Sequence, residues 1–133
     1  MNREALDFWD RALEALRAAE ALLGVSTDGA ASRAYYAAFY AVSALFAADG
    51  VTFKRHSAAE AAVHRDLVRS GKWSADLGAS YAKLLELRQT SDYGGGKHVG
   101  IDDARQALEA AKAIVAAVSH SRPGQFPVPR DSA

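Results

Sequence analysis

The segment LRQTSDYGGGKH gathers side chains that bind phosphate and move protons. It contains Arg88, Asp92, Tyr93, Lys97 and His98 around three consecutive glycines. Arginine and lysine stabilise negative charge on phosphate, and histidine exchanges protons near neutral pH. Glycine permits backbone angles that other residues avoid. The segment is therefore a candidate catalytic turn or ligand-binding edge, or else an ordinary helix end with polar neighbours.

Helical spacing places Arg88 on the inward face of the helix that must position it. We expect this helix to cover about 74–92, with an apolar stripe through Tyr81 and Leu84 that continues to Arg88. Asp92 follows Arg88 by one turn, which is the spacing of a local ion pair. The arginine should therefore point toward the interior or an interface, restrained by Asp92.

The whole chain is predicted to be all-α. Alanine is abundant, and proline is absent before Pro123. Strand-like alternation is missing, and apolar residues recur at helical spacing in five segments, at about 3–24, 28–49, 57–70, 74–92 and 102–120. This pattern predicts an antiparallel, up-and-down bundle of four long helices plus a shorter one.

The chain is expected to divide into a bundle over residues 1–120 and a tail over 121–133. The tail is rich in proline and has no periodicity, so we expect a partner subunit that grips Phe126 to order it. Within the bundle, the 28–49 helix is apolar on two faces and should be central. Arg33 and Tyr36 lie one turn apart on this helix, so the arginine needs a partner near buried surface.

Composition excludes several classes of function. The 133 residues carry no net charge and no cysteine, which rules out disulfides and thiolate chemistry. The amphipathic, acidic N-terminus does not resemble a signal peptide, and no apolar run approaches about 20 residues, so we expect a cytoplasmic chain without a membrane span. The four histidines lack metal-ligand spacing on one helix face, and glycine-rich phosphate loops and dinucleotide fingerprints are missing. We therefore expect neither a metal nor a cofactor.

A basic cluster between residues 54 and 72 is the one local feature that favours RNA. Since the chain is neutral overall, contact with a nucleic acid would require such a patch, although a solvated helix face has the same composition. The cluster consists of Lys54, Arg55, Arg65, Arg69 and Lys72.

Four stretches together resemble the HEPN domain (higher eukaryotes and prokaryotes nucleotide-binding), in its small stand-alone prokaryotic branch. The resemblance covers most of residues 3–120. It implies a bundle of four to five helices that forms a two-fold dimer, commonly partnered by a minimal nucleotidyltransferase in toxin–antitoxin operons. The stretches are SRAYYAAFYAVSALF at 32–46, HSAAEAAVHRDLVRSGKW at 56–73, LLELRQTSDYG at 84–94 and the acidic pair at 102–103.

The resemblance also implies where a ribonuclease site would lie. In the ribonuclease members, a histidine follows the motif arginine after four to six residues, and two copies face each other across the dimer cleft. Arg88 matches that arginine, but Asp92, Tyr93 and Gly94 occupy the window where the histidine should stand. His98 follows only after the glycines, and a tyrosine with a pKa near 10 is a poor base at neutral pH.

Three hypotheses therefore remain open. The first is a dimeric module that binds a nucleotide, RNA or a partner protein through Arg33, Tyr36, Arg88, Asp92, Tyr93 and Lys97. The second is a metal-independent ribonuclease toxin that uses Arg88 with His98 or Tyr93. The third is a helical adaptor without a ligand, in which Arg88 and Asp92 only orient the helix end.

Overall fold

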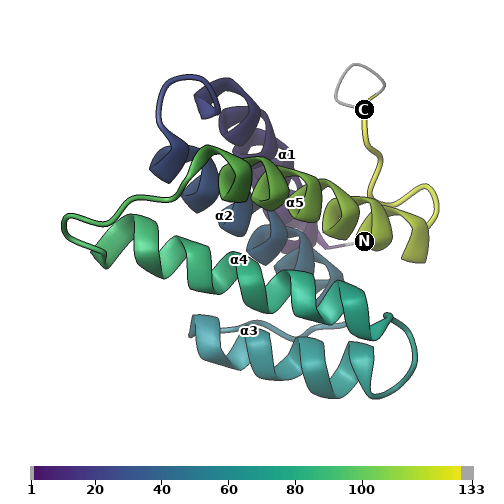
Figure 1. Cartoon of the computed structure of the whole chain (residues 1–133). Helices are drawn as coiled ribbons and strands as arrows, with labels where there is room; N and C mark the ends of the chain where they lie inside the picture. Colours follow the sequence, from purple (N-terminus) through teal and green to yellow (C-terminus); the bar gives the residue numbers. More distant parts are fainter. Residues whose placement is uncertain (1, 130–133) are drawn as a thin grey trace.

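The computed structural model describes residues 2–129, and the described chain is an all-α bundle, as predicted (Figure 1). The helices begin and end within about two residues of the predicted segments, except that the third is divided. A π-helical turn, η1, directly continues α3, as the i−5 hydrogen bond from the Arg69 N–H to the His64 carbonyl shows. The elements are α1 (Arg3–Leu22), α2 (Thr27–Ala47), α3 (His56–Ala62), η1 (Val63–Val68), α4 (Ala75–Tyr93) and α5 (Ile101–Ser121).

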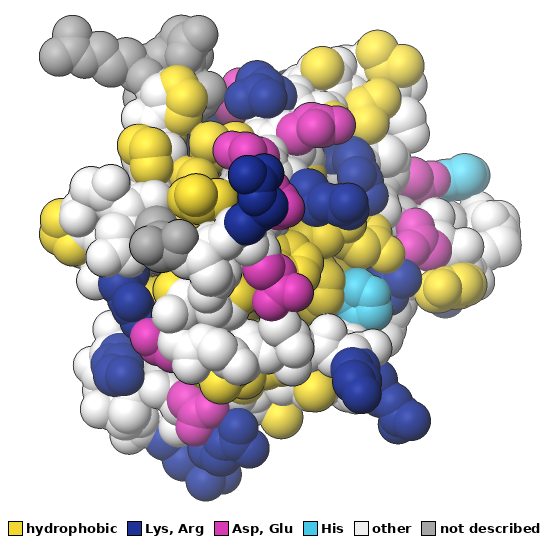
Figure 2. Space-filling model, turned by 180° about the vertical axis from the view of Figure 1, so that it is seen from behind, with side chains coloured by type: hydrophobic (Ala, Val, Ile, Leu, Met, Phe, Trp, Pro, Cys, Tyr) yellow, Lys and Arg dark blue, Asp and Glu magenta, His cyan; other side chains and the backbone are white. Residues whose placement is uncertain are grey.

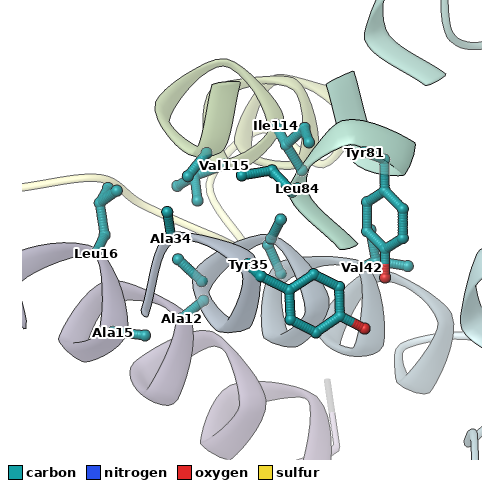
Figure 3. Packing of buried hydrophobic residues seen from close by; sticks show 14 of the residues in the cluster. Ala12, Ala15, Leu16, Ala34, Tyr35, Val42, Tyr81, Leu84, Ile114 and Val115 are labelled. Carbon is teal, nitrogen blue, oxygen red and sulfur yellow. The ribbon is translucent and has the colours of Figure 1, made fainter. Parts of the chain in front are cut away.

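Helix α2 is central, as its two apolar faces predict, because it packs against α1, α3, α4 and α5. In Figure 1, α5 crosses in front of α1 and α2, α4 lies beside α5, and the rod formed by α3 and η1 lies on the other side of α4. Fully buried Tyr35 and Val42 of α2 face Tyr81 and Leu84 of α4, with Ile114 of α5 above them (Figure 3). Many buried alanines on α1 and α2 allow these two helices to approach closely.

Short polar side chains fix the helix starts. The Ser26 hydroxyl accepts the Gly29 N–H at the start of α2, and the Ser74 hydroxyl accepts the Leu77 N–H at the start of α4. Helix α3 has no side-chain cap and begins at His56. This start brings the His56 side chain into the first turn of α3, beside α2.

The tail is held by its own chain as far as the structure describes it. Phe126 is fully buried, and its ring packs against Trp9 at a centroid distance of 5.1 Å. The Trp9 indole Nε1 donates a 2.8 Å hydrogen bond to the Pro127 carbonyl. The expected partner subunit is therefore not needed to hold Phe126, because α1 supplies the contacts.

Among residues 2–129, no helix is long and apolar enough to cross a membrane.

Candidate functional site

Arg88 is the centre of the site, and the structure confirms its ion pair with Asp92. Its Nε lies 2.9 Å from Asp92 Oδ2, but the N–H is not aligned with that oxygen as a hydrogen bond. Its Nη2 donates a 3.1 Å hydrogen bond to the Tyr36 hydroxyl. The Arg88 side chain is only 14% exposed, as expected for its place on the inward stripe of α4. One acid therefore offsets a largely buried guanidinium, and the Nε–H lacks an aligned acceptor.

Aromatic rings surround this guanidinium. Its central carbon lies 5.7, 5.5 and 5.7 Å from the ring centroids of Tyr35, Tyr36 and Tyr93. These are cation–π distances, and they favour a charged arginine at a site that is partly shielded from water. Tyr93 is 74% exposed, so one wall of the site is a tyrosine face open to solvent.

A second arginine shares the Tyr36 ring. The Arg33 guanidinium lies 4.7 Å from the centroid of that ring. Arg33 also lines a hollow of about 330 Å³ between α1 and α2, together with Arg11 and Tyr40. Figure 2 shows basic side chains and a histidine bordering a hydrophobic area on the face turned away from the view of Figure 1. The predicted ligand residues Arg33, Tyr36 and Arg88 are thus brought together around one ring.

His56 is the histidine that sequence reasoning missed. Its Nδ1 lies 2.8 Å from the Tyr35 hydroxyl, and its ring packs on Phe39 at 4.4 Å and near Tyr36 at 5.7 Å. Burial, and then the positive charge of Arg88, lower the pKa of His56 below its ordinary value. No motif in the sequence links His56 to Arg88, since the link depends on how α3 packs against α2 and α4.

His98 and Lys97 lie apart from this cluster. The His98 Nδ1 donates to the Asp28 carboxylate, which also accepts a 2.7 Å hydrogen bond from the Val99 N–H. The GGGKH loop is thereby tied to the first turn of α2. Lys97 is exposed and forms no ion pair within residues 2–129. The structure therefore does not pair His98 with Arg88.

We expect Asp28→Ala to lower the free energy of unfolding by about 1–2 kcal/mol, since it removes both contacts of the loop. The bond to His98, and then the bond to the Val99 N–H, lower the pKa of the Asp28 carboxyl. Because this pKa is lower in the folded state, the ionised carboxyl stabilises the fold at pH values above the unfolded-state pKa of about 3.9. The stabilisation is lost as the pH falls through the folded-state pKa. Urea unfolding at pH 7 and pH 3 measures the difference.

Asp76→Ala is the matched control. Asp76 also stands second in its helix after a serine cap, but it is exposed and forms no side-chain bond within the described residues. Its removal should cost less than about 1 kcal/mol. Equal losses for the two variants at pH 7 would contradict the role of the Asp28 contacts.

The predicted basic cluster is divided between the two ends of one helical rod. Lys54 and Arg55 precede α3, Arg65 lies within η1 about 15 Å further along at 1.5 Å per residue, and Arg69 and Lys72 follow the end of η1. Arg65 is also paired with Asp66 at 2.9 Å. The five side chains therefore do not form one compact patch.

No group of three or more histidine or acidic side chains in the described part of the chain could hold a metal ion.

Comparisons with known proteins agree with this fold. The sequence profile of the HEPN domain matches residues 5–121. The UPF0332 protein of Thermotoga maritima is 43% identical over 95 residues, which cover 70% of this chain and 72% of that protein. The crystal structure of TT1696 from Thermus thermophilus has a TM-score of 0.75 and 26% sequence identity, over 92% of this chain and 100% of that one.

Proposed function

Because this chain belongs to the HEPN domain family, we propose that it is a homodimeric module that binds the phosphate of a nucleotide, free or within RNA, at Arg88. The observation that carries the proposal is the Arg88 environment. A largely buried arginine, with one acid and a surrounding cage of tyrosines, is a costly arrangement for a surface without a ligand.

The chemistry of the cluster suits a nucleotide. Guanidinium groups bind phosphate oxygens through parallel N–H donors, and aromatic side chains stack on unpaired bases. Arg88 and Arg33 supply the first kind of group, and exposed Tyr93 supplies the second. A few cations of this kind suffice for a short single-stranded ligand, although the chain as a whole is neutral.

Cleavage of RNA by Arg88 with His98 or Tyr93 gains less support. Asp92 offsets the charge of Arg88, and His98 is engaged by Asp28 on α2. Tyr93 is mostly exposed, and within residues 2–129 the charge and rings around it include no group placed to act as a general base with it. We therefore place binding ahead of catalysis for these residues.

The proposed dimer would bring two copies of the site together. Half-buried aromatic residues on α1 and α2 leave apolar surface beside Arg88, which a second copy could cover. Light scattering should then give twice the chain mass of 14.1 kDa. A monomer at micromolar concentration would remove this part of the proposal.

A minimal nucleotidyltransferase is the protein partner that family membership favours, in a toxin–antitoxin or defence setting. Copurification of such a protein, encoded beside this chain, tests the partnership. If a protein of another class is encoded beside this chain and binds it stably on the same face, that protein would replace the nucleotidyltransferase as the proposed partner.

The binding function is tested by fluorescence anisotropy with a labelled single-stranded RNA and with a labelled adenine nucleotide. We expect saturable binding, with log affinity falling against log salt by about 0.7 for each phosphate contacted. Binding of the nucleotide alone would identify a free nucleotide as the ligand. Absence of binding to both probes would favour the adaptor hypothesis.

A further inference from the structure

We infer that His56 donates a second hydrogen bond, through Nε2, to the phosphate that Arg88 binds. The inference rests on the proposed function and adds to it a residue that lies outside the segment around Arg88. It also assigns that residue a chemical role, because the Tyr35 hydroxyl beside Nδ1 favours the tautomer with hydrogen on Nε2.

His56 and Arg88 come from different helices and meet at the same two tyrosines. The His56 ring lies 5.6 Å from the Tyr35 centroid and 5.7 Å from the Tyr36 centroid. The Arg88 guanidinium lies 5.7 and 5.5 Å from the same two centroids. Burial, and then the nearby charge of Arg88, lower the pKa of His56, so an anion that binds Arg88 on this side of Tyr36 comes near the His56 ring.

The Tyr35 hydroxyl determines the tautomer of this ring. Tyr35 is fully buried, and burial raises its pKa to about 12, so the hydroxyl keeps its hydrogen at physiological pH. A buried hydroxyl needs an acceptor, and His56 Nδ1 lies 2.8 Å away. The Tyr81 hydroxyl also lies near the Tyr35 hydroxyl (Figure 3), and its influence on the pKa of Tyr35 is that of a donor, so it does not compete with Nδ1 for the Tyr35 hydrogen. Tyr35 therefore donates to Nδ1, and the neutral ring carries its hydrogen on Nε2.

The Nε2–H is available to a ligand. His56 is half-buried, and its only side-chain hydrogen bond within residues 2–129 is the one to Tyr35. Nε2 is not among the buried polar atoms that lack a partner, so it retains access to solvent. Because its acceptor nitrogen, Nδ1, is engaged by the Tyr35 hydroxyl, neutral His56 is a donor to phosphate and not a base.

The ligand should also couple binding to protonation. The charged and titratable groups that face His56 are Tyr35 and Tyr36 on α2 and Arg88 on α4, and Glu60 on α3 itself acts on Tyr35. Burial and Arg88 keep the ring neutral near pH 7, whereas a bound phosphate favours its charged form. Binding therefore takes up a proton, and affinity should rise as pH falls from 8 to 6.

Two variants with the two labelled probes test the inference. His56→Phe retains the packing on Phe39 but removes the donor, so the affinity at pH 7 should fall about fivefold to tenfold, the effect of one net hydrogen bond. His56→Gln retains a donor that cannot be charged, so it should bind more tightly than His56→Phe and lose the pH dependence. If the affinities for RNA and for the nucleotide change in parallel, both probes share the phosphate contact. If the affinity for one probe alone falls, that probe carries the phosphate that His56 contacts.

The outcomes separate this inference from the proposed function. If the wild type binds and folded His56→Phe binds equally well, the His56 donor is refuted while the binding function stands. If the wild type binds neither probe, the proposed function itself fails. NMR of the imidazole nitrogens in the wild type gives a readout that needs no variant. A neutral ring with hydrogen on Nδ1 would overturn the inference, and hydrogen on Nε2 would support it.

Discussion

Arg88→Ala should weaken binding of RNA or nucleotide by about tenfold to a hundredfold. A hydrogen bond between charged groups contributes about 1.5–3 kcal/mol, and the Arg88 side chain is only 14% exposed. Arg88→Lys should recover little of this loss, because an ammonium group has no planar fork and stacks poorly on tyrosine rings. Anisotropy titrations at fixed salt measure both effects.

Asp92→Asn tests whether the acid paired with Arg88 competes with the ligand. It retains the size of the side chain but removes the charge that competes with a ligand for Arg88. Its affinity should therefore rise by about threefold to tenfold, since a charge near a protein surface contributes on the order of 1 kcal/mol. Weaker binding by Asp92→Asn would show that Asp92 holds the arginine in place rather than competing for it. Unchanged binding by Arg88→Ala would remove Arg88 from the site.

Phe126→Ala should lower the free energy of unfolding by about 3–5 kcal/mol. Its ring is fully buried against Trp9, and removal of such a ring from a core leaves a cavity. Urea unfolding monitored by circular dichroism measures the change. Trp9→Phe is a milder control, because it keeps a ring but deletes the 2.8 Å bond to Pro127, at a cost of about 1 kcal/mol.

Protein concentration distinguishes a tail held by its own chain from one held by a partner. If α1 of the same chain binds Phe126, the loss caused by Phe126→Ala should be the same across a hundredfold range of concentration. A loss that grows with concentration would indicate that a second subunit also grips the tail.

The fold could be predicted because the sequence signals that specify each helix lie within that helix. Apolar periodicity and serine caps lie within each helix, so the predicted 28–49 helix corresponds to Thr27–Ala47 and the predicted 74–92 helix to Ala75–Tyr93. The Arg88–Asp92 pair was predictable for the same reason, because both residues belong to one helix turn.

The remaining features depend on contacts between distant segments. His56 reaches the site through the packing of α3 on α2, which helical spacing does not specify. The glycines suggested that His98 could approach Arg88, but the Asp28 carboxylate on α2 holds it instead. A single phenylalanine in a proline-rich tail has no periodicity, so the sequence offered no sign that Phe126 belongs to the core.

The contact between Trp9 and the tail also has a consequence for the order of folding. α1 and α2 are neighbours in sequence and can form a hairpin early, whereas the Trp9–Pro127 bond joins residues 118 positions apart. Closing so long a loop costs roughly 4 kcal/mol of chain entropy, beyond a constant, if nothing between its ends is yet ordered. The intervening helices remove most of that cost once they have formed. We therefore expect the indole of Trp9 to be covered late in folding, after the helices between it and the tail have formed.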